Sequence, residues 1–187
     1  RVLFRSDGYL RKNVGMGLEI AGMMRPIMSL SLVTASLLQC TPVAYDTAFS
    51  EMAVAQKKEV LGLETIADQL ASLDAFPAEQ QAAAIVDMIR HADEARKEFR
   101  DMIAAHKAQD LELLMKLAKE SKFDNEGDNP EAEAALLDKR NKTWIPVIEK
   151  AMKATPTFFA FGAAHLAGPN GVVSLLRQSG YTVRGIR

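Results

Sequence analysis

Apolar residues recur at helical spacing through most of the chain, and short continuous apolar runs interrupt this pattern in three places. Between residues 77 and 120 there are almost no helix-breaking residues, and apolar stripes alternate with charged positions. The stripes comprise Ile85, Met88 and Ile89, followed by Leu111, Leu113, Leu114, Met115 and Leu117. This spacing predicts two or more helices that pack antiparallel.

Further helices are predicted on both sides of this region. Residues 45–58 should form a short helix capped near Asp46 or Thr47. After a loop over 121–130, Asn129 and Pro130 are a typical helix start. That helix should continue to about residue 154, with a disturbance before Pro146. A last helix is expected over 169–178.

The short apolar runs predict strands. They cover residues 59–63, 157–161 and 181–185, and each is bounded by polar or turn-forming residues. Combined with the helices, they predict an α+β fold with a small mixed sheet surrounded by many helices. We expect residues 7–187 to be the C-terminal part of a single domain.

Residues 1–6 are a separate case. Their sequence, RVLFRS, is the translation of the end of a common sequencing adapter. We therefore expect these six residues to be a non-native scar of sequence assembly. On this hypothesis the natural protein starts upstream, and a secretion signal or an upstream motif is missing from the chain.

Composition narrows the function classes. With 48% hydrophobic and 25% charged residues among 187, the chain can bury a core. A net charge of -1 gives no basic surplus for binding nucleic acid. The single cysteine, Cys40, cannot form an internal disulfide, which leaves the cellular compartment open.

The uncharged run over 26–45 is interrupted by polar residues, so a buried helix opened by Pro26 is favoured over a transmembrane one.

One histidine lies in a conspicuous setting. Gly162, Ala163 and Ala164 lead from an apolar run to His165, where small residues leave room beside an imidazole that can bind a metal or move a proton. The alternative is a loop histidine bonded to backbone. Residues 168–171 offer a second alternative, an anion site at the start of the next helix. His91 and His106 lie among charged helical residues and should face solvent.

Three segments together resemble the TraB/GumN family, whose wider clan includes the Tiki proteases. The stretch FFAFGAAHLAGPNG, continued by GYTV, matches its C-terminal G-A-x-H-L-x-G signature. RNKTW at 140–144 is similar to its R-N-x-x-W segment, and GLETIADQL at 62–70 to its G-L-E-T segment, with Ala67 in place of one residue of the usual acidic pair before Asp68. The family's first G-x-x-H motif is absent from this sequence.

The resemblance implies a function and a set of site residues. The resemblance to Tiki-like members implies a metal-dependent peptide hydrolase of the bacterial envelope or periplasm. In such members, two G-x-x-H motifs and acidic residues are expected to form the active site. By position, His165 would be a metal ligand or the catalytic base, and Glu64 a carboxylate ligand, for zinc, manganese or cobalt. Arg140 and Asn141 would be polar groups at the catalytic site. If the strands that precede Glu64 and His165 are neighbours, both side chains meet at one rim of the sheet.

Two ligands fall short of the three that a catalytic zinc normally takes. We therefore expect the chain alone to bind metal weakly and to hydrolyse little. The alternative function is a non-enzymatic envelope protein that binds a peptide or an anionic small molecule at the loop over 162–171.

Overall fold

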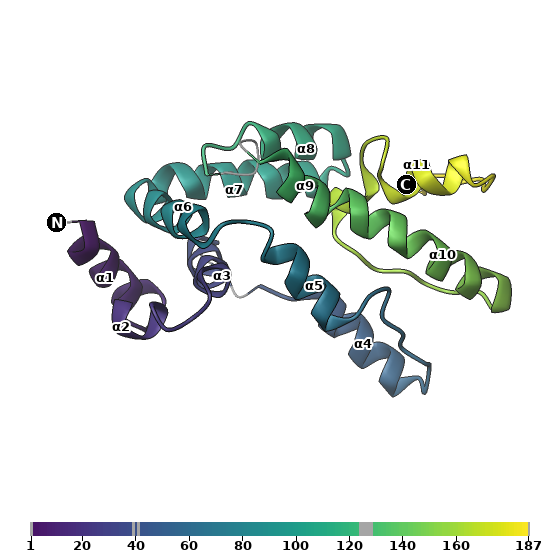
Figure 1. Cartoon of the computed structure of the whole chain (residues 1–187), viewed down its shortest axis with the longest axis horizontal. Coiled ribbons are helices and arrows are strands. Elements are labelled where there is room, and N and C mark those ends of the chain that lie inside the picture. The colour runs from purple at the N-terminus through teal and green to yellow at the C-terminus, as the bar shows by residue number, and fades with distance from the viewer. Residues whose placement is uncertain (1, 39, 41, 124–128, 187) are drawn as a thin grey trace. The chain divides into compact units, whose positions relative to one another are not determined.

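The computed structural model describes residues 2–38, 40, 42–123 and 129–186. These residues form helices joined by turns and extended segments, without a strand among them (Figure 1). The chain divides into two compact units, one made of residues 1–42 and 76–130 and the other of residues 43–75 and 131–187. Each unit combines two separate stretches of sequence.

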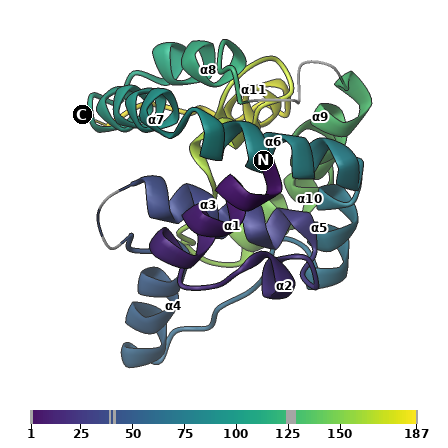
Figure 2. The ribbon, with the colours of Figure 1, turned by 90° about the vertical axis from the view of Figure 1, so that its left-hand side faces the viewer.

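The first unit is a helical cluster. Its elements are α1 (Val2–Asn13), α2 (Leu18–Ala21), α3 (Pro26–Leu37), α6 (Ala78–Arg90), α7 (Ala92–Lys107) and α8 (Leu111–Lys119). Helices α1 and α3 lie beside α6, and α8 folds back along α7 (Figure 2). The core of this unit consists of residues from α1, α2, α3, α6, α7 and the segment after α8, namely Leu10, Ala21, Val33, Leu37, Met88, Ile89, Ala95 and Phe123. The helices predicted between residues 77 and 120 are thus confirmed.

The uncharged run after residue 25 also forms the predicted buried helix. Pro26 occupies the first turn of α3, where its missing N–H costs nothing. Val33 and Leu37 of this helix are almost completely buried in the core. Within the described residues, no helix has both the length and the apolar character needed to cross a membrane.

The second unit is built around one long helix. Its elements are α4 (Tyr45–Ala55), α5 (Ile66–Leu73), α9 (Pro130–Leu136), α10 (Asp138–Ala154), the 3₁₀ helix η2 (Ala163–Leu166) and α11 (Val172–Gln178). The core consists of Trp144 and Ile148 from α10 and Val172 from α11. Leu63, Ile145, Met152, Phe159, Phe161 and Leu176 pack against it. The long helix therefore supplies much of the surface against which α11, Leu63 and the segment 157–161 pack.

The predicted α+β fold and its mixed sheet are wrong. Segments 59–63, 157–161 and 181–185 are not strands. Segment 157–161 keeps the period-2 alternation of an extended chain, because Phe159 and Phe161 pack on the core while Phe158 is 73% exposed. Apolar composition favours a strand only where a neighbour completes the hydrogen-bond ladder, and helix α10 offers apolar contacts instead of backbone partners.

Helix boundaries in the second unit differ in detail from the predictions. The predicted start at Pro130 is confirmed, but the break in the following helix lies at Leu137, between α9 and α10. Pro146 lies inside α10, which runs through it to Ala154. Helix α4 starts after Ala44, which makes no side-chain capping bond, so the predicted cap near Asp46 or Thr47 is also displaced. Part of the predicted loop, residues 124–128, lies outside the described residues.

We expect Ile148→Ala to destabilise the second unit by about 2–5 kcal/mol, because it opens a cavity where the side chain is 1% exposed. Val147→Ala, at the neighbouring position and 39% exposed, should cost less than about 1 kcal/mol. Urea unfolding followed by fluorescence reports this unit selectively, since Trp144 is the only tryptophan in the chain. Equal destabilisation by the two substitutions would contradict the assignment of Ile148 to the core.

Candidate functional site

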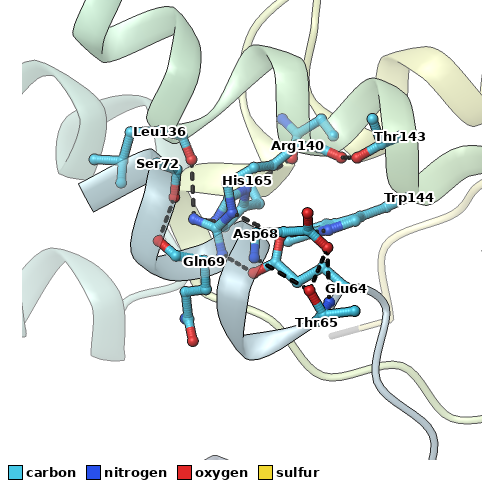
Figure 3. A network of polar contacts seen from close by, with 11 residues as sticks. Glu64, Thr65, Asp68, Gln69, Ser72, Leu136, Arg140, Thr143, Trp144 and His165 are labelled. Carbon is cyan, nitrogen blue, oxygen red and sulfur yellow. Dashed lines mark hydrogen bonds and ion pairs between the residues drawn. The ribbon is translucent and has the colours of Figure 1, made fainter. Parts of the chain in front are cut away.

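Glu64, Arg140 and His165 meet in one polar cluster of the second unit (Figure 3). The Arg140 guanidinium binds the Glu64 carboxylate through two parallel hydrogen bonds, with Nε to Oε2 at 3.0 Å and Nη2 to Oε1 at 2.7 Å. Nη1 of Arg140 lies 3.5 Å from Nε2 of His165. The three motifs that were matched separately in the sequence therefore converge on one place.

Local backbone geometry places Glu64 directly before α5. Thr65 is the N-cap of this helix and forms a capping box with Asp68, whose backbone N–H donates to Thr65 Oγ1 at 3.1 Å. A Cβ atom at Gly62 would lie 2.8 Å from the Glu64 carbonyl oxygen, so the turn requires glycine there. Asp68 thus fixes the start of the helix, and Glu64 is left to face α10.

Helical spacing on α10 places Trp144 beside Arg140. Residues four apart share a helix face, and the Arg140 guanidinium carbon lies 5.0 Å from the centre of the Trp144 ring. The indole N–H of Trp144 donates to Glu64 Oε2 at 3.1 Å. Nη1 of Arg140 also donates to the Leu136 carbonyl at 2.9 Å. Trp144 is both a core residue and a direct partner of the carboxylate.

His165 is buried in the 3₁₀ helix η2 and held on both ring nitrogens. Its Nδ1 lies 2.7 Å from Oδ1 of Asn141, a side chain that is itself only 1% exposed. Its ring lies 4.5 Å from the Trp144 ring, centre to centre. The ring position is thus determined by α10 on three sides, through Arg140, Asn141 and Trp144.

The loop that follows His165 depends on two glycines. Gly168 has φ +78°, a conformation that favours glycine, and a Cβ at Gly171 would overlap the Ala167 carbonyl oxygen. Gly162, the glycine of the G-x-x-H motif, has φ −60°, and a Cβ there would make an ordinary 3.8 Å contact with His165 Cδ2. The tight turn therefore follows the histidine.

Burial and the ion pair set the proton affinities of the cluster. Burial raises the pKa of the Glu64 carboxyl, but hydrogen bonds from Arg140 and Trp144 and the charge of Arg140 outweigh it, so the net pKa is below the usual value. Burial, aided by the Arg140 charge and partly opposed by Glu64, lowers the pKa of His165 to about 4. At neutral pH the cluster contains an ionised carboxylate, a guanidinium and a neutral imidazole.

By itself, this arrangement does not form a complete site for a catalytic metal ion. No group of three histidine, cysteine, aspartate or glutamate side chains with ligand geometry exists within the part of the chain that the structure describes. Glu64 is engaged by a cation, and the Arg140 guanidinium lies against the Nε2 atom that would bind zinc, manganese or cobalt. A divalent ion here would have to displace a positive charge that is already paired.

All four predicted site residues lie in or beside the cluster. The predicted rim of a sheet is wrong, because Glu64 precedes a helix and His165 lies in one. The sequence-based prediction missed the hydrogen bond from Trp144 to Glu64, although the four-residue spacing between Arg140 and Trp144 is visible in the sequence. It also missed Asp138 and Asn170, which are bonded to each other at 2.7 Å. His91 and His106 are exposed, as predicted.

Comparison with models of known protein families identifies the family of this chain. The model of the TraB/PrgY/gumN family matches residues 4–185. The chain belongs to the TraB/PrgY/gumN family. The match covers nearly the whole chain, and so extends beyond the three motifs into the first helical unit. Neither a curated protein nor a solved structure matches significantly.

The lowered pKa of His165 predicts that acid destabilises the second unit. A histidine with an unfolded pKa of 6.5 and a folded pKa of about 4 contributes stability that is complete above pH 6.5 and is lost as the pH falls towards 4. Between pH 7 and pH 5 the free energy of unfolding should fall by at most about 2 kcal/mol. Urea unfolding monitored by Trp144 fluorescence measures this change.

The matched variants are His165→Gln and His91→Gln. The first should flatten the dependence between pH 5 and 7, whereas the second, at an exposed position, should retain it. A wild-type chain equally stable at both pH values would contradict a neutral, buried His165.

We also expect zinc, manganese and cobalt to bind this chain more weakly than micromolar. Arg140→Gln should strengthen binding at least about tenfold, because it removes one positive charge from the two candidate ligands. Isothermal titration of each metal checks both statements. Stoichiometric binding at micromolar affinity or better that disappears in His165→Ala would show that a complete site exists.

Proposed function

We propose that this chain carries the Glu64 and His165 part of a metal-dependent peptide hydrolase of the TraB/PrgY/gumN family. The observation that supports this most directly is the convergence of Glu64, Arg140 and His165 in a buried cluster. A histidine with a merely local role would not need contacts to two other family motifs. Because the cluster offers two candidate ligands at most, residues outside it must complete the metal site.

The chain's own residues have distinct roles in this proposal. His165 presents Nε2 as the basic atom of the cluster, and Glu64 holds Arg140 in place through two hydrogen bonds. Nε and Nη1 of Arg140 are engaged, as is one N–H of Nη2. The second N–H of Nη2 would polarise a peptide carbonyl, where negative charge develops during hydrolysis.

In this proposal, the low basicity of His165 makes the arrangement an inactive state of the cluster. A neutral imidazole with a pKa of about 4 is a weak base, and the nearby guanidinium is one cause of that low value. A substrate carbonyl that draws Arg140 away from Nε2 would raise the basicity of His165. Substrate binding and activation would then be coupled through one side chain.

A location in the bacterial envelope or periplasm is part of the same proposal and follows from the family resemblance alone. Fractionation of cells that express the complete gene would test it. The complete gene also tests whether further ligands exist, since a second G-x-x-H motif in its product would favour the enzyme. Its absence favours the alternative, a non-enzymatic protein that binds a peptide or an anionic small molecule at the loop over 162–171.

A peptide-library cleavage assay on the product of the complete gene, with and without chelator, tests the activity. We expect cleavage that chelator abolishes and that His165→Ala reduces by at least about a hundredfold, the usual contribution of such a group. His106→Ala, at an exposed histidine, should cleave normally. The 187-residue chain alone should cleave little. Saturable peptide binding without cleavage by the complete product would favour the binding protein.

A further inference from the structure

A chain of hydrogen bonds runs from Asp138 through Asn170 and Asn141 to His165. The Asn170 amide donates to Asp138 Oδ2 at 2.7 Å. The Asn141 amide donates to the Asn170 backbone carbonyl at 2.9 Å, and Asn141 Oδ1 lies 2.7 Å from His165 Nδ1. The chain links the start of α10, the loop before α11 and the histidine.

The direction of each bond follows from what each group can donate. The Asn170 carbonyl only accepts, so the atom of Asn141 that faces it must be the NH₂ group. Asn141 therefore presents its oxygen to His165, and Nδ1 must carry the proton of the neutral ring. If the Asn141 amide were flipped, its oxygen would face the Asn170 carbonyl oxygen, which is also an acceptor. Its NH₂ group would then face the His165 ring.

The neighbour on the opposite side of the His165 ring independently favours the same tautomer. Arginine has donors and no acceptor, so the Arg140 guanidinium next to Nε2 requires a lone pair on that nitrogen. A second proton on the ring would point at the guanidinium. Both neighbours therefore favour the same neutral form, with hydrogen on Nδ1 and a free pair on Nε2.

We infer that Asn141, anchored by Asn170 and Asp138, is a positioning residue that fixes His165 in the Nδ1–H tautomer. Nε2 is then the ring atom able to accept a proton or an electrophile, and it faces Arg140. This rests on the proposed function, since it assigns Asn141, predicted as a catalytic polar group, to act through His165. Neutral imidazole in water prefers hydrogen on Nε2, so the protein must impose the opposite form.

Long-range ¹H–¹⁵N correlation spectra of the labelled chain at neutral pH read the tautomer directly. In the Nδ1–H form the unprotonated nitrogen, Nε2, couples to both carbon-bound ring protons, whereas in the Nε2–H form the unprotonated nitrogen couples strongly to Hε1 alone. The His165 signals are those lost in His165→Gln, which separates them from the other two histidines. The wild type should show the Nδ1–H pattern, and an Nε2–H pattern would overturn the inference without any further variant.

Asn141→Leu and Asn141→Asp separate the role of Asn141 from that of Arg140. The leucine keeps similar volume but removes the acceptor, and it should shift the ring towards the Nε2–H form. The aspartate restores an acceptor oxygen and should retain the Nδ1–H form. If leucine leaves the wild-type pattern unchanged, Arg140 alone sets the tautomer and Asn141 has no positioning role.

Thr143→Ala is the matched control on the same helix, since the exposed Thr143 hydroxyl donates to the Arg140 backbone carbonyl at 2.8 Å and not to the His165 ring. It should show the wild-type pattern. These spectra need no substrate, so a failure of peptide cleavage leaves the tautomer result intact, and an Nε2–H ring in an active enzyme would overturn this inference alone.

Discussion

The paired hydrogen bonds between Arg140 and Glu64 are the contact on which the second unit depends most. The two side chains are 14% and 15% exposed, so each would be left as a nearly buried, uncompensated charge without the other. The contact joins residues 76 positions apart. The extended segment that ends at Glu64 has no ladder of its own, and it is held to α10 by this pair, the Trp144 bond and the packing of Leu63. Fold and site therefore share one interaction.

The charges of Glu64 and Arg140 balance each other, and His165 is neutral beside them at neutral pH. Arg140 satisfies Glu64 and at the same time suppresses the basicity of His165, so neither group is a strong base in this arrangement. A group that competes for the guanidinium would release both at once. The same residue that stabilises the fold thus limits the chemistry, a conflict that is common where buried charges serve a site.

The helices could largely be predicted from the sequence, as could the residues that meet in the polar cluster, whereas the predicted sheet is wrong. Helical periodicity is a local property, and it identified the helices between residues 77 and 120, while the uncharged run opened by Pro26 indicated α3. Strand formation depends on a neighbouring strand, which an alternating apolar pattern alone does not guarantee. Phe159 and Phe161 show this alternation because they pack against helices. Family resemblance located Glu64, Arg140 and His165, whereas Asp138 and Asn170 were missed, because their roles arise only when the loop before α11 returns to the start of α10.

The glycines around His165 bear on how such sites should be sought in other sequences. A search pattern written as G-x-x-H gives its weight to Gly162, where the backbone would accept a side chain. The stricter demand falls on Gly171, six positions beyond the histidine, where any Cβ collides with the main chain. A pattern that made the first glycine optional and the later one mandatory would follow the geometry of this loop more closely, and would recover chains that the shorter motif rejects.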